Sequence, residues 1–506
     1  MKAYLMFRNT NDSKAVSEVY GSDVLMRDLE MRHIIAAMDG KDKLINAVCT
    51  RVIASPLHRT EDILYRQSIL LDALNQPEAV RKLYHICSET DKRKHGFWGG
   101  LECSYLTSTY STAIDYMECY LWGLQEFRHV ADQYKDCFFS EGFGNLFQML
   151  EQELSDSYLA EAKRLISELK TKDGMLISAE MGDYLQGVNY VLRCREKHIL
   201  NWDWASTPSY RLNERDDKGA KDLQHREELA INEAANALAQ SASHLENFFT
   251  MLQTELAFYV GCLNLWDQIA ADNMPYCIPQ IKQAGSRDRS WDNLYDLSLL
   301  LLKERDITAN TCQAEEKSLY IITGANQGGK TTFLRSIGQA QVMAQCGMFV
   351  GAAKMKVPVR CGIFSHFKKE EDSTVKSGKL DEELQRMSDI ANHLEPDSMI
   401  LFNESFSATN EREGSEISKQ ITDALIRSKD EIFFVTHLYT YAAGYKDHAE
   451  ALFLKAQRKG NGTRTYHIMP GVPDKTAFGE DLYDKIFIKT SDSKLPVDNL
   501  RQDELK

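Results

Sequence analysis

Residues 324–331 read Gly-Ala-Asn-Gln-Gly-Gly-Lys-Thr, and this short segment constrains the fold more than any other feature of the chain. An apolar run at 319–322 precedes it, and apolar residues at helical spacing follow it over 333–349. A G-x-x-x-x-G-K-[ST] loop between a strand and a helix predicts a phosphate-binding loop. Its glycines let backbone N–H groups close around phosphate oxygens, and the helix N-terminus favours the negative charge. We therefore predict that a nucleoside triphosphate binds here.

The side chains of this loop have separable roles. Lys330 would bring a positive charge to the β- and γ-phosphates, and the Thr331 hydroxyl would be a ligand of Mg²⁺. The loop residues that we assign to nucleotide binding are Gly324, Ala325, Asn326, Gln327, Gly328, Gly329, Lys330, Thr331 and Thr332. The expected cofactors are ATP or ADP and Mg²⁺.

Two later strands end in polar residues that suit the same site. The apolar run 399–402 ends in Asn403 and Glu404, where such a strand usually ends Asp-Glu. Glu404 would polarise the attacking water, whereas Asn403 can approach the metal but brings no charge to it. The run 431–435 is followed by Thr436 and His437, and His437 could sense the γ-phosphate. We predict Glu404, Lys330 and His437 as catalytic residues and Thr331 and Asn403 as the metal site.

The pattern of apolar residues changes along the chain near residue 318. Before it, helical spacing dominates, with one long helix predicted over 149–169 and another over 226–259. In the second, Leu238, Leu245, Leu252 and Tyr259 recur every seven residues, which indicates a packed seam within a bundle or between two chains. We expect loops at 201–222 and 283–292.

After residue 318, short strands alternate with helices. We predict strands at 319–322, 399–402 and 431–435, helices at 333–349, 384–394 and 417–425, and a hairpin of 451–455 with 463–469. The predicted fold class is therefore an all-helical half followed by an α/β domain of the P-loop NTPase type.

The composition of the 506 residues excludes some classes of protein. The formal net charge of −14 argues against a small basic nucleic-acid module, although a local basic surface can still bind DNA. Eleven dispersed cysteines favour free thiols over a disulfide framework. No run approaches the roughly 18 apolar residues of a membrane span, and no signal peptide is evident, so we expect a cytoplasmic protein, nucleoid-associated if bacterial.

The motifs together resemble those of the MutS family of DNA mismatch-repair ATPases. Residues 323–332 match seven of the ten positions of the family's T-G-P-N-M-G-G-K-S-T, and 343–350 are similar to its M-A-Q-x-G-x-F-V. Asn403-Glu404 and Thr436-His437 stand where the family has D-E and T-H, and Ser377-Gly378 followed by Glu383 resembles its mobile S-G loop. Weaker similarity covers 55–67 and 276–279. We add Asn310 and Ser377 to the candidate nucleotide-binding residues.

The resemblance implies a domain order. It gives a helical core in 1–135, a clamp- or lever-like helical excursion in 136–240, and a return helix and connection in 241–290. An ATPase domain with a dimerisation surface follows in 291–490, with a tail in 491–506. The family's N-terminal mismatch-reading domain and the C-terminal Smr domain of one branch have no counterpart in this sequence, so we expect a short member.

The resemblance also implies a function. We expect an ATP-hydrolysing, homodimeric clamp on duplex or branched DNA that does not itself read mismatches, with repair or recombination proteins as partners and no membrane. ATP hydrolysis would be slow if the uncharged Asn403 is a poor substitute for the usual aspartate. The alternative is a nucleotide-controlled protein scaffold with little DNA affinity. Basic runs that could contact DNA, or merely be solvated, are Lys92-Arg93-Lys94-His95 and the group Arg193, Arg195 and Lys197.

Overall fold

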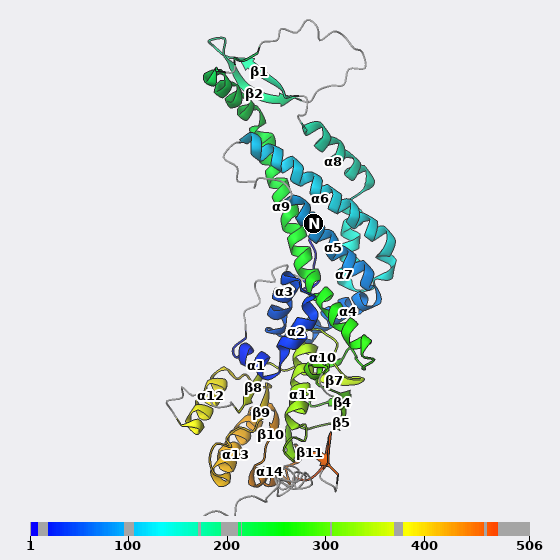
Figure 1. Cartoon of the computed structure of the whole chain (residues 1–506), viewed down its shortest axis with the longest axis vertical. Coiled ribbons are helices and arrows are strands. Elements are labelled where there is room, and N and C mark those ends of the chain that lie inside the picture. Colours follow the sequence, from blue (N-terminus) through cyan, green and yellow to red (C-terminus); the bar gives the residue numbers. More distant parts are fainter. Residues whose placement is uncertain are drawn as a thin grey trace, which may run out of the picture. The chain divides into compact units, whose positions relative to one another are not determined.

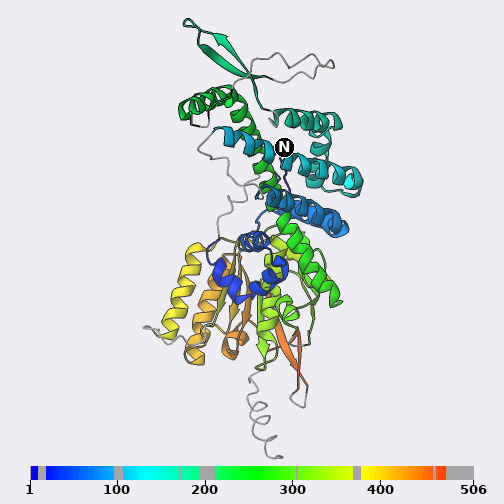
Figure 2. The same cartoon turned by 45° about the horizontal axis from the view of Figure 1, so that its top comes forward.

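The chain forms two compact units (Figure 1, Figure 2). The first combines residues 1–13 with 71–260, and the second combines 14–70 with 261–506. This computed structural model describes residues 2–8, 19–95, 106–170, 174–193, 211–213, 215–303, 306–368, 378–459 and 463–473. Over these ranges, no helix has both the length and the apolar character that crossing a bilayer demands.

The first unit is mainly helical. Its elements are α5 (Pro77–His95), α6 (Leu106–Tyr134), the 3₁₀ turn η1 (Lys135–Cys137), α7 (Glu141–Glu153), α8 (Asp156–Leu169) and α9 (Asp217–Ala271) as far as residue 260. Phe127 of α6 packs between Phe248 and Phe249 of α9, with ring centroids 6.3 and 5.1 Å away. An aromatic core therefore joins two helices that are more than a hundred residues apart in sequence.

The long helices differ from their predicted bounds. The single helix predicted over 149–169 is wrong, because α7 ends at Glu153 and the Ser155 hydroxyl caps α8 by accepting a hydrogen bond from the Tyr158 N–H. The helix predicted over 226–259 is confirmed but begins at Asp217, so the end of the predicted 201–222 loop is helical. Leu252 and Tyr259 of its heptad seam are buried within this unit, which favours packing within the chain.

A two-stranded antiparallel hairpin interrupts the helices of the first unit. It consists of β1 (Leu176–Met181) and β2 (Gly187–Arg193), and sequence reasoning missed it. Met181, Tyr184 and Leu185 near its turn are 77%, 87% and 81% exposed. The all-helical description of the first 310 residues is thus corrected to a mainly helical one.

An N-terminal stretch is anchored to α9. The buried Glu255 carboxylate accepts hydrogen bonds from the N–H groups of Leu5 and Met6, and the Tyr259 hydroxyl donates to the Leu5 carbonyl. Ala3, Leu5 and Met6 of this stretch are therefore buried in the first unit.

The second unit is built on a six-stranded sheet of order β12-β11-β6-β10-β9-β8. The strands are β6 (Leu319–Gly324), β8 (Ile363–Phe367), β9 (Met399–Asn403), β10 (Glu431–Val435), β11 (Ala451–Arg458) and β12 (Arg464–Pro470). All pairs are parallel except β11 with β12, which form the predicted hairpin. The predicted strands 319–322, 399–402 and 431–435 are confirmed.

Helices cover both faces of this sheet, as Figure 1 shows. They are α11 (Lys330–Gln345), α12 (Lys379–His393), α13 (Glu411–Arg427) and the short α14 (Tyr439–Gly444). Alternate strand residues such as Ile321, Phe402 and Phe434 form one core with side chains of α12, α13 and α14. On the other face, Tyr320 stacks on Phe433 at 4.1 Å and α11 packs above them. The α/β class predicted for this half is confirmed.

A second sheet was not predicted. Its order is β3-β7-β4-β5, formed by β3 (Gln280–Lys282), β7 (Lys354–Pro358), β4 (Arg289–Leu294) and β5 (Asn310–Ala314). The predicted connection over 283–292 is therefore wrong from residue 289 onward, where β4 buries Trp291 against Phe333 of α11. The remaining helices of this unit are α1 (Ser22–Asp28), α2 (Met31–Asp39), α3 (Lys43–Ile53), α10 (Leu297–Leu302) and α4 (Thr60–Asn75) as far as residue 70.

A fully buried ion network ties the two sheets together. The Glu431 carboxylate at the start of β10 accepts bonds of 2.7 and 2.6 Å from Arg289 of β4 and one of 2.9 Å from Arg360, which follows β7. All three side chains have no solvent exposure. Burial alone would raise the pKa of Glu431, but the two guanidinium groups lower it to about 2. The two guanidinium groups therefore favour the charged form of Glu431 despite its burial.

Candidate nucleotide site

The predicted site residues meet at one edge of the six-stranded sheet. In the parallel register Val435 of β10 lies beside Ile322 of β6 and Asn403 of β9, so these three strands end at the same level. The carboxyl edge of a parallel sheet is where such folds bind ligands. The loop 324–329, the pair Asn403-Glu404 and the pair Thr436-His437 all follow these strand ends.

The phosphate loop needs its glycines for two physical reasons. Gly324 and Gly329 have φ of 115° and 89°, which side chains rarely tolerate. At Gly328, an added Cβ would lie 2.8 Å from the Ala325 carbonyl and 2.9 Å from Ala456 Cβ. The loop is thus wrapped tightly against β11, and α11 begins directly after Gly329.

Lys330 is the buried cation of the loop. Its side chain is 5% exposed, and the ammonium donates to the carbonyls of Gly324 and Ala325 at 3.0 and 3.1 Å. Burial lowers its pKa to about 8, with Glu404 raising it and Arg464 lowering it further. Across the described ranges, no carboxylate lies within ion-pair distance of this ammonium. A buried ammonium without a carboxylate partner can be compensated by an anionic ligand.

Thr331 and Asn403 place two oxygen atoms side by side. The Thr331 hydroxyl donates to Asn403 Oδ1 at 3.0 Å, and both side chains are half-buried. Hydroxyl and amide oxygens are hard donors, and Mg²⁺ at nucleotide sites takes only one or two protein ligands beside phosphates and water. The pair therefore fits Mg²⁺. In the parts of the chain that the structure describes, no cluster of three His, Cys, Asp or Glu offers a metal cage.

Glu404 and His437 form a hydrogen-bonded pair. His437 Nε2 lies 2.9 Å from Glu404 Oε1, and both side chains are partly exposed. This bond is the main reason that the pKa of Glu404 lies below its ordinary value, with the charge of Lys330 also contributing. Glu404 adopts a left-handed backbone with φ of 54°, which turns the chain sharply at the end of β9.

The segment after Glu404 is fixed by a second set of contacts. Glu383 of α12 accepts a hydrogen bond of 2.7 Å from the Phe406 N–H, and His366 Nδ1 lies 2.7 Å from the Ser405 hydroxyl. All of these side chains are buried. The turn that carries Glu404 is therefore supported by β8 and by the first turns of α12.

The other residues predicted to bind the nucleotide lie at different places in the second unit or outside the described residues. Asn326 and Gln327 are exposed on the loop, and Thr332 is half-buried in the first turn of α11. The Asn310 side chain is buried on β5, where its carbonyl accepts the Ile468 N–H at 2.7 Å, so its evident contact is with β12. Ser377 lies outside the described residues.

Sequence reasoning missed one residue of this neighbourhood. Arg464 begins β12, and its Nε donates to the Asn326 carbonyl at 3.2 Å, so the hairpin brings a second cation to the loop. Tyr466 of the same strand lies against Gly329, at 3.5 Å from a Cβ added there. The only signal in the sequence was a basic residue in a hairpin, which by itself indicates nothing.

The basic runs considered for DNA contact are partly engaged in the first unit. Lys94 pairs with Glu246 at 2.5 Å and with Asp91 at 3.2 Å, and the Arg93 guanidinium lies 3.7 Å over the Trp122 ring. Arg193 is exposed at the end of β2. Arg195 and Lys197 lie outside the described residues.

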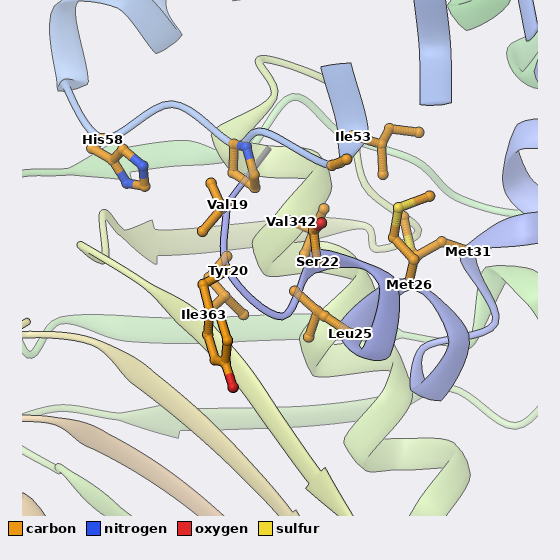
Figure 3. A pocket seen from close by; sticks show the side chains of 12 residues that line it. Val19, Tyr20, Ser22, Leu25, Met26, Met31, Ile53, His58, Val342 and Ile363 are labelled. Carbon is orange, nitrogen blue, oxygen red and sulfur yellow. The ribbon is translucent and has the colours of Figure 1, made fainter. Parts of the chain in front are cut away.

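An apolar pocket is also present in the second unit (Figure 3). Its lining comes from residues 19–31 and 53–58 together with Val342 of α11 and Ile363 of β8. None of the predicted nucleotide residues lines it. A lining dominated by Leu, Ile, Val and Met side chains does not suit a charged nucleotide, so we do not assign the pocket to that ligand.

Comparisons with known proteins cover both halves of the chain. Residues 58–272 match the family model of the MutS2 N-terminal domain, and residues 320–481 match that of MutS domain V. MutS protein homolog 4 of Mus musculus is 24% identical over 263 residues, which are 51% of this chain and 25% of that protein. Endonuclease MutS2 of Streptococcus equi subsp. equi is 30% identical over 169 residues, 32% of this chain and 21% of that protein.

A third relative, the DNA mismatch repair protein MutS of Leptospira interrogans, is 23% identical over 273 residues, 50% of this chain and 32% of that protein. The chain thus spans between about a fifth and a third of the length of these curated relatives. With both family models matched and these relatives sharing the same family name, the chain belongs to the MutS family.

Proposed function

We propose that this protein is an ATPase whose active site is the edge formed by the phosphate loop, Asn403-Glu404 and His437. The observation that carries the proposal is Lys330, a buried cation that donates to two loop carbonyls and lies within electrostatic range of Glu404. Phosphate oxygens would replace those carbonyls as acceptors. The N–H groups of the first turn of α11 would add further donors.

The hydrolysis that we propose needs few protein groups. The oxygen of a water bonds to the γ-phosphorus, the bond from that phosphorus to the β–γ bridging oxygen breaks, and ADP and phosphate leave. Glu404 orients the water and accepts its proton, and His437 holds the carboxylate and faces the developing charge. Thr331 and Asn403 would hold Mg²⁺, which when bound neutralises charge on the phosphates.

We further propose that the protein is a dimeric, nucleotide-gated clamp on duplex or branched DNA and does not itself read mismatches. Support comes from family membership and from relatives whose names specify DNA mismatch repair. Contacts to the DNA backbone would dominate, so the affinity should fall steeply with salt. The proposed domains are those given above, with the dimer surface in the ATPase domain.

Nucleotide binding is tested first. Lys330→Ala should raise the Kd for ATP by on the order of a hundredfold, because a buried charge-assisted contact to phosphate is lost. Titration with a fluorescent ATP analogue measures this. Lys419→Ala, on the exposed side of α13, is the matched control and should bind as the unaltered protein does. Equal affinities in all three proteins would refute the site.

DNA binding is tested separately by fluorescence anisotropy on homoduplex and four-way-junction DNA at low and moderate salt. The protein is compared without nucleotide, with ADP and with a non-hydrolysable ATP analogue. Binding that depends on the nucleotide supports the clamp. Binding of ATP without binding of any DNA would refute the clamp and favour a nucleotide-controlled scaffold, which the net charge of −14 would suit.

A further inference from the structure

The turn that follows β9 has an unusual backbone. Glu404 and Phe406 have φ of 54° and 58°, in the left-handed region that favours glycine. Two such residues so close together cost free energy, and their conformation persists only where the surrounding contacts hold it. Because Glu404 is the residue proposed to orient the attacking water, the contacts that hold this turn also determine where its carboxylate lies.

One of these contacts comes from α12. The Glu383 carboxylate accepts a hydrogen bond of 2.7 Å from the Phe406 N–H, and the Glu383 side chain is only 5% exposed. A backbone N–H in a buried turn needs an acceptor. Removing Glu383 would leave this N–H buried without that acceptor, which costs more free energy than the bond contributes while it is made.

His366 of β8 connects the turn to α12. The Ser405 hydroxyl donates to the His366 carbonyl at 2.6 Å and lies 2.7 Å from ring nitrogen Nδ1. The other ring nitrogen, Nε2, lies 3.0 Å from the carbonyl oxygen of Glu383. The His366 ring also stacks on that of Phe406, with centroids 5.2 Å apart. The turn, β8 and the start of α12 are therefore packed together through buried side chains.

The backbone of the same turn also meets α13. A Cβ added at Gly414 would lie 2.5 Å from the Phe406 carbonyl oxygen. A side chain there would force the backbone to shift, so the turn already fills the space beside α13. The Phe406 peptide is thus held by α13 at its carbonyl and by Glu383 at its N–H.

We propose that Glu383 is a positioning residue for ATP hydrolysis, which fixes the turn so that Glu404 faces the phosphates. The proposal rests on the ATPase function proposed above and deepens it. Glu383 touches neither the nucleotide nor the water and acts through the Phe406 N–H alone. This role needs one acceptor oxygen, which a glutamine amide also offers. It governs turnover, whereas ATP affinity depends on the phosphate loop.

The test measures single-turnover hydrolysis and the Kd for ATP in the whole chain. Glu383→Ala should lower turnover by roughly tenfold or more, because small displacements of a catalytic group have effects of this size, and should leave the Kd for ATP nearly unchanged. Glu383→Gln keeps an oxygen for the Phe406 N–H and should retain most of the turnover. Asp381→Ala, which removes an exposed carboxylate from the first turn of α12, is the control and should hydrolyse ATP normally.

A double variant separates positioning of Glu404 from a general structural role. Adding Glu383→Ala to Glu404→Gln should lower turnover little beyond Glu404→Gln alone, because the position of a missing carboxylate no longer matters. A general defect would instead multiply the two losses. If Glu383→Ala fails to fold, Gly414→Ala displaces the same turn from α13 and takes its place in the comparison.

Three results would overturn the role of Glu383 and leave the nucleotide site standing. They are unchanged turnover in Glu383→Ala, equal losses in Glu383→Ala and Glu383→Gln, and losses that multiply in the double variant. Failure of the unaltered protein to hydrolyse ATP would instead refute the proposed function, on which this role depends.

Discussion

The charged side chains near the two ends of strand β10 differ in whether they have partners of opposite charge. At its start, Glu431 is fully buried and bonded to both Arg289 and Arg360. Just beyond its end, His437 is bonded to Glu404, while the nearby cation Lys330 has only carbonyl oxygens as acceptors. At the start of β10, the charged side chains therefore pair with one another. At its end, Lys330 pairs with no carboxylate of the described residues.

The difference suggests how structural and ligand-binding charges can be told apart. A buried charge without a countercharge costs free energy, so folding favours clusters in which every charge is paired. An unpaired buried cation is tolerated where a ligand compensates for it. The start of β10 should therefore govern the stability of the second unit, and its end should govern affinity and turnover. Four predictions separate these effects.

The largest effect should come from Glu431→Gln. Loss of this carboxylate leaves Arg289 and Arg360 buried without their countercharge, at a cost of about 3–5 kcal/mol in the free energy of unfolding. Urea denaturation, followed by the intrinsic tryptophan fluorescence to which the buried Trp291 contributes, measures it. Glu404→Gln makes the same chemical change after β9, beside the other end of β10, and should alter the stability little. Equal losses in the two variants would contradict the comparison.

Glu404→Gln should instead reduce turnover. Removing the group that accepts the proton should lower the rate of ATP hydrolysis by about a hundredfold while ATP remains bound. Single-turnover hydrolysis and equilibrium binding distinguish the two quantities. Glu416→Gln, on the exposed face of α13, is the control and should hydrolyse ATP normally. Undiminished turnover in Glu404→Gln would remove this residue from the mechanism.

ATP affinity should depend on pH through Lys330. Because burial lowers the pKa of the unliganded lysine to about 8, its charge is present below that pH and lost above it. Phosphate favours the charged form, so the affinity should fall as the pH rises, by roughly tenfold between pH 7 and pH 9. Calorimetric titration at several pH values measures this. In Lys330→Arg, whose guanidinium stays charged, the dependence should vanish; a flat profile in the unaltered protein would argue against the lowered pKa.

The smallest effect is expected from Asn403→Asp. The new carboxylate can keep the hydrogen bond from Thr331 and adds a negative charge toward Mg²⁺, so the Mg²⁺ concentration at half-maximal hydrolysis should fall by up to about fivefold. Hydrolysis rates across a Mg²⁺ titration give this value. Asn403→Ala, which removes the oxygen, should shift it the other way. If both variants titrate like the unaltered protein, Asn403 lies outside the metal site.

Local patterns predicted β6, β9 and β10 because each is a short apolar run, and they predicted the β11–β12 hairpin from its glycine turn, but they missed β8 of the same sheet. The same patterns missed β4 and β5, which pair with each other, and β4 also pairs with β7 far along the chain. The break at Ser155 was missed because the apolar spacing continues across it, whereas one hydroxyl cap decides where α8 begins. The bounds of α9 were also displaced, because the helix begins at Asp217 and ends at Ala271, beyond the apolar seam at both ends.

In the candidate site, too, some features could be predicted from the sequence and others could not. The positions of Lys330, Thr331, Asn403, Glu404 and His437 follow from strand ends, which the sequence reveals. The contacts between pairs of these residues do not follow from the sequence. Neither the bond between His437 and Glu404 nor the approach of Arg464 to Asn326 can be read from spacing, because each depends on the order in which the strands lie in the sheet.

That strand order has a consequence for how the protein is made. β6, which carries the phosphate loop, lies between β10 and β11, and both are synthesised more than a hundred residues later. Pairings between segments so distant in sequence form slowly, and a nascent chain cannot form them at all until the later strands have left the ribosome. During translation the edges of β6 therefore remain without their final partners until residue 456 has emerged, which makes this interval the one in which the growing chain most needs protection from aggregation.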